Sequence, residues 1–480
     1  MMEVFAGFLT HADHHIGRLL EFLKTINEFE NTIIVVTSDN GASSEGGPTG
    51  SINENLFFNN VPESLTENLA ALDGLGGPEY FNHYAWGWTW AGNTPFRRWK
   101  RETYRGGISD PLIVHWSGGI QSKGEIRPQY AHAIDLVPTV LELLNIEPPS
   151  TIKGVTQSPI EGVSFAHSLG NANVPTKHLT QYFEMMGHRS IYHDGWRAVC
   201  PWPGPSFTEA GQFFGVPISA QTLTDLDTNH WELYHVAEDF AENHNLAADN
   251  RPKLIELIST WYVEAGKYNV LPIDGRGTQR MGEERPTIAD NRTSYTYYPH
   301  TQSIPSNAAV KILNRSHSIT ADVEIPPGGA EGVLLAHGGN DGGYSFYLKG
   351  GKLYWVHNYV ARSLYQVESV ESIPEGRHQL RFEFEVTGEP DIAKGKGTPG
   401  RAQLYIDGKL VGDADIPVTT PLALGLGNGV NVGIAPGSPI TPDYEPPFQF
   451  TGKIHTVVVD VTGELIKDSE AELRAILARQ

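Results

Sequence analysis

Cysteine is nearly absent from this sequence. Cys200 is the single cysteine among 480 residues, which excludes an intramolecular disulfide and a zinc site built from cysteine ligands. Disulfides are typical of secreted proteins, so their absence favours a reducing compartment. We therefore expect a cytoplasmic location.

Long apolar runs are absent as well. No stretch approaches the roughly 18 consecutive apolar residues that a membrane-spanning helix needs, so we expect no membrane span. The first residues, Met1 to Phe5, lack the basic region that opens a secretory signal peptide. They lead directly into a helical pattern, and we expect residue 1 to lie inside a domain.

The chain has a deficit of positive charge. Its 35 Lys and Arg residues are outnumbered by 56 Asp and Glu residues, which gives a formal net charge of −21 at pH 7. Nucleic acids and anionic membranes repel a strongly acidic protein, so we expect neither as a partner. An anionic small substrate would need a local basic patch.

The composition is that of a loop-rich globular protein. A chain of 480 residues exceeds what one hydrophobic core supports, and two or three domains are expected. The 51 Gly, 32 Pro and 10% aromatic residues fit compact domains with many loops.

The first part of the chain alternates helix and strand patterns. Residues 3–24 and 130–146 carry apolar side chains at helical spacing, and residues 32–38 and 108–116 have the pattern of strands. The run over 32–38 is β-branched and continuously apolar, which is typical of a strand buried on both faces of a parallel sheet. We predict an α/β fold with a mixed, mainly parallel sheet and flanking helices.

The rest of the chain is dominated by short strand patterns. Strands and turns alternate over 180–235, which predicts a small antiparallel sheet, and a helical pattern follows over 252–266. Period-two runs from 316 to 461 predict a β-sandwich, of the concanavalin-like kind. The expected parts are 1–175 for the α/β core, 176–271 for the small sheet and its helix, 272–304 for a linker, and 305–480 for the sandwich with a terminal helix over 468–479.

The strand over 32–38 ends in Asp39-Asn40-Gly41. In an open parallel sheet the ligand crevice lies beyond the carboxyl ends of the strands, so this turn is a candidate site. Asp39 and Asn40 offer a carboxylate and an amide oxygen, the ligands that Ca²⁺ and Mg²⁺ take. The alternative is that these residues form only a turn.

Residues 42–107 form a long segment that we expect to cover the site, because loops of this length in compact domains are usually functional. The segment ends in a basic cluster, which either supplies local positive potential or is a solvated stretch. Its members are Arg97, Arg98, Lys100, Arg101 and Arg105. Upstream, Trp88 belongs to an aromatic run that either walls an aryl-substrate pocket or anchors the segment, and His83 is a candidate acid.

Five stretches occur in an order that carries a family resemblance. They are residues 12–20, the strand and Asp-Asn pair of 34–41, the lysine segment of 93–108, the helical stretch of 132–140, and the Glu-Leu-Tyr, acidic and Asn-Leu signature within 231–247. Together they resemble the C-terminal portion of a formylglycine-dependent sulfatase, arylsulfatase-like, of the alkaline-phosphatase-like superfamily.

The resemblance implies a site for sulfate esters. It assigns Asp39 and Asn40 to a divalent cation, Ca²⁺ or Mg²⁺, and Lys100 to the sulfate oxygens. Arg97 and Arg98 would add positive potential near the substrate. His83 is a further candidate for a sulfate contact.

One essential motif of that family is absent. The family's formylglycine arises from a Cys or Ser in Cys/Ser-x-Pro-x-Arg, and this sequence has no such motif. Cys200-Pro201-Trp202 fails because Trp202 stands where Pro is needed. Formylglycine is therefore not encoded in this chain. We expect a truncated or split product that needs a separate N-terminal sulfatase segment as its partner.

Two functions from different classes follow. The leading hypothesis is a sulfuric ester hydrolase, arylsulfatase-like, in which this chain supplies part of the metal and sulfate site and is inactive alone. The alternative is an inactive sulfatase remnant that binds glycans or proteins through its β-sandwich. Phosphoester hydrolysis fits less well, because a two-zinc phosphatase would want several His ligands.

Overall fold

The computed structural model describes residues 1–121, 124–201, 221, 224, 230–274, 292–301, 303–306 and 308–465. Contacts divide the chain into two compact units. Unit 1 contains Met1–Phe5, Glu45–Trp86 and Pro286–Gln480, and unit 2 contains Ala6–Ser44 and Gly87–Arg285. The chain therefore passes from unit 2 into unit 1 at residue 45 and returns to unit 2 at residue 87. The expected domains followed one another along the sequence and did not include this exchange. The terminal helix expected over 468–479 lies outside the described residues.

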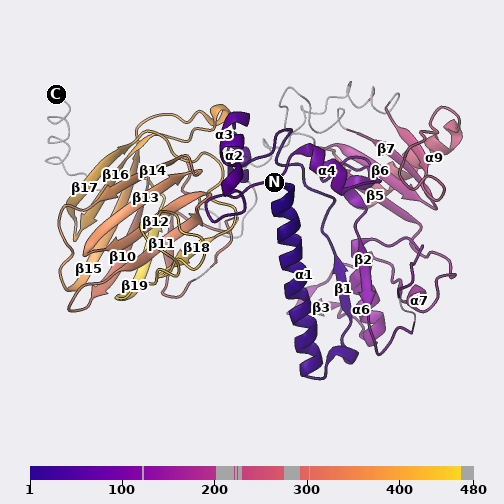
Figure 1. Ribbon diagram of the computed structural model, residues 1–480, viewed down its shortest axis with the longest axis horizontal. Helices are drawn as coiled ribbons and strands as arrows, with labels where there is room; N and C mark the ends of the chain where they lie inside the picture. The colour runs from indigo at the N-terminus through magenta and orange to yellow at the C-terminus, as the bar shows by residue number, and fades with distance from the viewer. Residues whose placement is uncertain are drawn as a thin grey trace. The chain divides into compact units, whose positions relative to one another are not determined.

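Helix α1 spans Met2–Thr25, close to the predicted 3–24 (Figure 1). Apolar spacing of this kind usually marks a buried face, but none of its residues is buried, and Phe8, Leu19 and Phe22 are exposed. The apolar periodicity correctly indicates a helix with one apolar face. It does not indicate whether another element packs on that face. Among the described helices, none is long and apolar enough to cross a membrane.

The two strands predicted near the candidate site do pair, but in the opposite sense. β1 (Ile34–Thr37) and β2 (Leu112–His115) form a two-stranded antiparallel sheet, with Ile34 opposite His115 and Thr37 opposite Leu112. The prediction of a mainly parallel, doubly buried sheet is wrong for this pair. Val36 is 40% exposed and Ile113 is 59% exposed. Branched apolar residues indicate a strand, but not its direction or cover.

Short helices precede and follow these two strands along the chain. The 3₁₀ turn η1 (Phe29–Asn31) precedes β1, and α4 (Trp86–Gly92) and α5 (Arg105–Ile108) precede β2. The helix predicted over 130–146 is a 3₁₀ turn η3 (Ala133–Asp135) followed by α6 (Leu136–Leu144). A hairpin of β3 (Thr151–Ile152) and β4 (Val155–Thr156) and the short α7 (Ala166–Leu169) follow.

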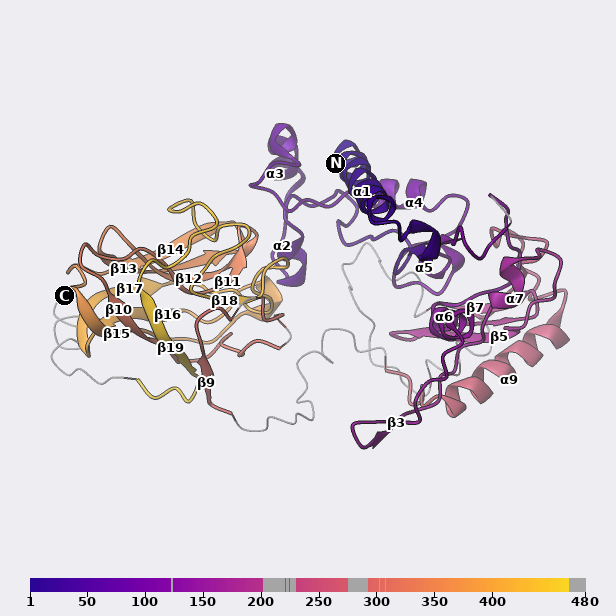
Figure 2. The ribbon, with the colours of Figure 1, turned by 90° about the horizontal axis from the view of Figure 1, so that it is seen from below.

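The small antiparallel sheet predicted over 180–235 is present. Its strands are β5 (Thr180–Met185), β6 (His188–His193), β7 (Trp196–Cys200) and β8 (Glu232–His235), paired in chain order. Helix α9 (Arg251–Lys267) packs against this sheet (Figure 2). Trp261 of the helix is fully buried together with Leu233, Ile191 and Cys200 of the strands. These elements position the basic segment described below.

Unit 1 is built on two antiparallel sheets. Six strands lie in the order β17, β16, β15, β10, β19, β9, and five lie in the order β14, β13, β12, β11, β18. One core of buried side chains draws on both sheets, including Ile319, Phe346 and Phe382. The strands are β9 (Ser294–Tyr297), β10 (His317–Ile325), β11 (Gly332–Gly339), β12 (Gly342–Lys349), β13 (Lys352–Tyr359), β14 (Ser363–Glu368), β15 (Gly376–Val386), β16 (Gly400–Ile406), β17 (Lys409–Ile416), β18 (Val430–Val432) and β19 (Lys453–Asp460). A 3₁₀ turn, η4 (Ile392–Lys394), precedes β16.

The stretch expected to be a linker, 272–304, contributes a strand. Residues Ser294–Tyr297 of β9 pair antiparallel with β19, with Tyr295 opposite Val459 and Tyr297 opposite Val457. Tyr295 and Tyr297 pack against the core. The period-two alternation is only four residues long, and polar flanks concealed it in the sequence.

Residues 45–86 are attached to the loops of these sheets by buried asparagines. The segment contains α2 (Glu54–Phe58), α3 (Leu65–Ala70) and the 3₁₀ turn η2 (Leu72–Gly74). The amide of Asn53 donates to the carbonyls of Asp341 and Val360, each at 3.0 Å. Asn59 Nδ2 donates to the Ala423 carbonyl at 3.0 Å, and Asn59 Oδ1 accepts from Ala423 N at 2.9 Å. Side-chain amides, bonded to backbone groups, thus attach this segment to the loops.

Three buried histidines lie within the sheets of unit 1. Burial lowers the pKa of His317 to about 4, that of His337 to about 4 and that of His357 to about 3. His357 Nε2 accepts a hydrogen bond from Thr420 N at 3.1 Å, which requires the unprotonated nitrogen. The fold therefore holds these rings in their neutral form at neutral pH.

We expect the free energy of unfolding of unit 1 to fall as pH drops from about 6.5 toward 4. Unfolded histidines take up protons near pH 6.5, whereas the buried rings stay neutral until the lower values, so protons favour unfolding. Above pH 6.5 both states are neutral and these groups add no slope. Urea denaturation between about pH 7 and pH 5 measures the effect. His317→Asn should flatten the slope and the exposed-site variant His300→Asn should not; equal slopes would contradict the prediction.

Candidate functional site

The turn after β1 and the lysine segment lie against each other in unit 2. Gly41 N donates to the Gly107 carbonyl at 3.2 Å, and Lys100 N donates to the Ala42 carbonyl at 3.1 Å. Gly41 and Ala42 directly follow the predicted cation residues, Asp39 and Asn40. Their backbone contacts therefore place this turn beside the segment that carries Lys100. The sequence separates the two stretches by about sixty positions, and the fold joins them.

Asn93 fastens this junction with one side chain. Its Oδ1 accepts from Ala42 N at 3.0 Å, while its Nδ2 donates to the carbonyls of Arg98 and Gly106, each at 2.8 Å. A primary amide has both a donor and an acceptor at its end, so it can hold three backbone groups that do not pair with one another. Asn93 therefore sets the spacing between the turn and the lysine segment.

Two glycines allow the backbones to approach. A Cβ on Gly41 would lie 1.7 Å from the Gly106 carbonyl oxygen, and a Cβ on Gly106 would lie 2.2 Å from the carbonyl oxygens of Arg97 and Arg98. No side chain can occupy such positions without moving the backbone. The glycine of Asp-Asn-Gly thus serves close packing as well as turning.

A second carboxylate, Asp110, lies near Asp39. Ser38 Oγ donates to Asp110 Oδ1 at 2.8 Å. Burial, together with the negative charge of Asp39, raises the pKa of Asp110. The sequence analysis missed Asp110, because antiparallel pairing places the start of β2 beside the end of β1, whereas the expected parallel pairing would place it at the far end. The sequence feature that could have indicated Asp110 is the Asp110-Pro111 pair directly before the second strand.

The donor set at this turn suits a hard cation. Asp39 is exposed and Asn40 is half-buried, and Asn40 Nδ2 donates to the Gly41 carbonyl at 2.9 Å, so the amide oxygen remains an acceptor. The negative charge of Asp39 contributes to the raised pKa of Asp110, and a nearby positive charge would offset that repulsion. Oxygen donors from carboxylates and an amide fit Ca²⁺ or Mg²⁺.

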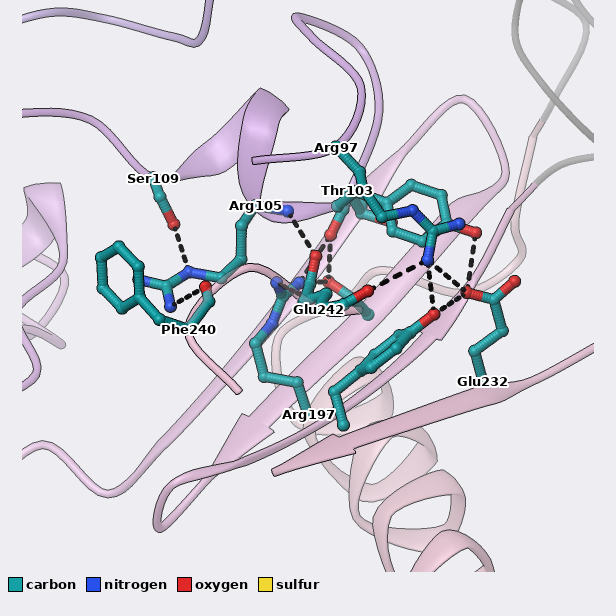
Figure 3. A network of polar contacts seen from close by, with 11 residues as sticks. Arg97, Thr103, Arg105, Ser109, Arg197, Glu232, Phe240 and Glu242 are labelled. Carbon is teal, nitrogen blue, oxygen red and sulfur yellow. Dashed lines mark hydrogen bonds and ion pairs between the residues drawn. The ribbon is translucent and has the colours of Figure 1, made fainter. Parts of the chain in front are cut away.

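Arg97 has partners within the protein. Its Nη1 donates to Tyr234 Oη at 2.7 Å and to the Glu242 carbonyl at 3.2 Å, and Glu232 Oε2 lies 3.8 Å away. Tyr104 Oη also donates to Glu232 Oε2, at 3.0 Å. Figure 3 shows Arg97 and Glu232, a residue of β8, pointing toward each other. Arg97 therefore attaches the lysine segment to the small sheet.

The buried carboxylate of Glu242 makes a second attachment. Its Oε1 accepts from Arg197 Nη1 at 2.5 Å, and its Oε2 accepts from Arg105 N at 2.9 Å. Arg197 also donates to the Thr103 carbonyl at 2.6 Å. Burial and the charge of Arg197 lower the pKa of Arg105 to about 10, so Arg105 stays charged at neutral pH. Each group in this network has a charged or backbone partner (Figure 3).

The remaining predicted residues are distributed between the two units. Lys100 and Arg98 are half-buried in unit 2, and the Arg98 guanidinium lies 5.8 Å from the Trp99 ring centre. Trp88 is exposed on α4 of unit 2. His83 belongs to unit 1, where its Nδ1 is 3.0 Å from the Tyr84 carbonyl oxygen. Their roles toward a substrate stay predictions.

Replacing Asn93 with Ala should lower the free energy of unfolding of unit 2 by about 2–4 kcal/mol. The change removes three hydrogen bonds and leaves the Ala42 N–H without its acceptor. Urea denaturation compared with Asn173→Ala, an exposed asparagine of the same unit, measures the loss. Equal stability of the two variants would contradict the assigned role of Asn93.

Comparison with known proteins shows a family similarity in the first part of the chain. Residues 1–146 match the family model described as Sulfatase. An uncharacterized sulfatase of Schizosaccharomyces pombe is 26% identical over 277 residues, covering 56% of this chain and 44% of that protein. The arylsulfatase of Klebsiella aerogenes is 28% identical over 189 residues, covering 39% and 38%.

The chain thus spans less than half the length of the curated relatives it matches. Among solved structures, the sulfatase yidJ of Bacteroides fragilis is 19% identical, with a TM-score of 0.31, and the match covers 54% of this chain and 41% of that one. The family model and the sequence relatives agree with the ordered motifs. Residues 1–146 of this chain are therefore similar to the sulfatase family.

Proposed function

We propose that this chain supplies the metal-binding and sulfate-binding part of a sulfuric ester hydrolase of the arylsulfatase type. The observation that carries the proposal is the junction made by Asn93. It joins the Asp39-Asn40 turn to the Lys100 segment within the residues that match the sulfatase family.

Each residue has a role that its chemistry supports. Asp39 and Asn40, with Asp110 beside them, would hold Ca²⁺ or Mg²⁺. Such an ion, when bound, offsets negative charge on sulfate oxygens. Lys100 binds those oxygens through its ammonium group, and Arg98 adds positive potential. Trp88 offers an aromatic surface for an aryl group.

Arg97 is a less direct contributor than the sequence suggested. Its hydrogen bonds to Tyr234 and the Glu242 carbonyl support a role in holding the lysine segment on the small sheet. His83 as an acid or sulfate contact stays a prediction. The two-sheet arrangement of unit 1 supports assigning it to the concanavalin-like sandwiches, which also stays a proposal.

We propose that the nucleophile comes from a separate sulfatase segment that carries Cys/Ser-x-Pro-x-Arg. Several helices and strands of unit 2 expose apolar side chains, which supports such a partner. They include Leu19 and Phe22 of α1, Val35 and Val36 of β1, Leu112 and Ile113 of β2, and Val137 and Leu144 of α6. A segment of complementary apolar strands would remove this surface from water.

Co-expression with such a segment should give release of sulfate from an aryl sulfate ester in the presence of Ca²⁺. Lys100→Ala should reduce the rate by at least about 100-fold, because the charge that develops on sulfate oxygens loses its ammonium partner. Lys177→Ala, at an exposed lysine of unit 2, is the control and should leave the rate unchanged.

The opposite result separates this function from the alternative. Absence of sulfate release in every such pairing would contradict the hydrolase. Binding of the chain to a glycan array, lost when the sandwich surface is altered, would then support the binding-module function.

Association with the same segment should depend on the apolar surface. Val36→Asp places a charge on β1 at a side chain that is already exposed, so the fold should tolerate it while the complex weakens by at least about tenfold. Sedimentation velocity of the co-expressed pair measures this. Val155→Asp, on the exposed hairpin strand β4, is the control. Equal weakening by both variants would count against a specific docking surface.

A further inference from the structure

Unit 1 contains a cluster of metal-ligating side chains outside the proposed sulfate site. Glu45, Glu54 and His83 each present one ligand atom, and these atoms all lie within 4.8 Å of one another. Small side-chain adjustments bring three atoms so placed to about 2.0–2.2 Å from a shared ion. In the described part of the chain, no other group of three such residues meets this spacing.

The backbones that carry two of the three ligands are paired. Ser51 N donates to the His83 carbonyl and His83 N donates to the Ser51 carbonyl, each at 2.9 Å. Glu54 N donates to the Phe81 carbonyl, also at 2.9 Å. Residues 51–54 therefore run alongside residues 81–83, and their side chains keep a fixed spacing without any ion.

The third ligand approaches through a glycine. A Cβ on Gly46 would lie 2.1 Å from the Tyr84 carbonyl oxygen and 2.8 Å from His83 Nδ1. Only a glycine lets the chain after Glu45 pass so close to His83. The carboxylate of Glu45 is thereby carried into the interior, where the residue is 2% exposed.

Glu54 is held by the sandwich loops. It is the first residue of α2, and the preceding Asn53 caps that helix by accepting from Asn55 N at 3.1 Å. The same Asn53 amide donates to the carbonyls of Asp341 and Val360. The position of Glu54 is thus determined by residues nearly 300 positions later in the chain.

A backbone carbonyl orients the histidine ring. Its Nδ1 lies 3.0 Å from the Tyr84 carbonyl oxygen. A carbonyl only accepts, so Nδ1 is the donor in this contact. Metal-binding histidines usually donate their other ring N–H to such a carbonyl, which orients the ring.

We propose that Glu45, Glu54 and His83 form a binding site for a divalent transition-metal ion, of which Zn²⁺ is the representative. Mixed carboxylate and imidazole ligands favour such an ion, whereas Ca²⁺ takes oxygen ligands alone. The ion ties the start of residues 45–86 to their end and so closes this segment on the sandwich loops. His83 then serves as a ligand rather than as the acid or sulfate contact expected from the sequence.

Isothermal titration calorimetry of the chelator-treated full chain with ZnCl₂ tests the site. An exposed pair on α1, His11 and His15, has ring nitrogens 3.1 Å apart and could also bind Zn²⁺, so the titrations use a His15→Asn background. One tight Zn²⁺ site is expected there. His83→Gln and Glu54→Gln should each weaken it at least about tenfold. Glu79→Gln, an exposed glutamate of the same segment, is the matched control and should not.

X-ray absorption of the Zn²⁺-loaded His15→Asn protein gives a readout that does not require the variants to fold. One imidazole with oxygen ligands supports the site, and two or more imidazoles overturn it. Unchanged Zn²⁺ affinity in folded His83→Gln and Glu54→Gln proteins overturns it as well. Tighter binding of Ca²⁺ than of Zn²⁺, lost in the same variants, overturns the assignment to a transition metal.

Discussion

The three hydrogen bonds of Asn93 are the constraint on which the candidate site depends. They join the turn after β1 to two carbonyls of the lysine segment. The junction works only because Gly41 and Gly106 leave room for it. The lysine segment is in turn attached to the β5–β8 sheet through Arg97, Arg105 and the buried Glu242. A chain of polar contacts therefore runs from the turn to the small sheet.

The sequence offered candidate residues at this turn but not the architecture around them. Asp39, Asn40 and Lys100 could be proposed because their short motifs carry recognisable residue types in a fixed order, and their roles stay predictions. The direction of β1 and β2 was not identifiable, because β-branched residues favour strands of either direction. That error concealed Asp110, whose position beside Asp39 follows only from antiparallel pairing.

Long-range packing set the other limit on prediction. The alternation over 316–461 indicated strands, since period two is a local signal. The return of residues 45–86 to unit 1 is not local. It rests on Asn53, Asn55 and Asn59, whose amides donate to the carbonyls of Asp341 and Ala423 in unit 1. Asparagines in a glycine-rich segment suggest turns. Their spacing does not predict a hydrogen-bond partner nearly 300 residues away in the sequence.

The electrostatics of unit 2 bear on the proposed cation. The chain carries a net charge of −21, and the basic cluster was a candidate source of local positive potential for a sulfate ester. Members of this cluster also hold the fold together: Arg97 donates to Tyr234, and Arg105 donates to Ser109 and the Phe240 carbonyl. Asp39 and Asp110 add negative charge at the adjacent turn. Positive charge from a bound ion would therefore do more to admit an anionic ester than the number of arginines suggests.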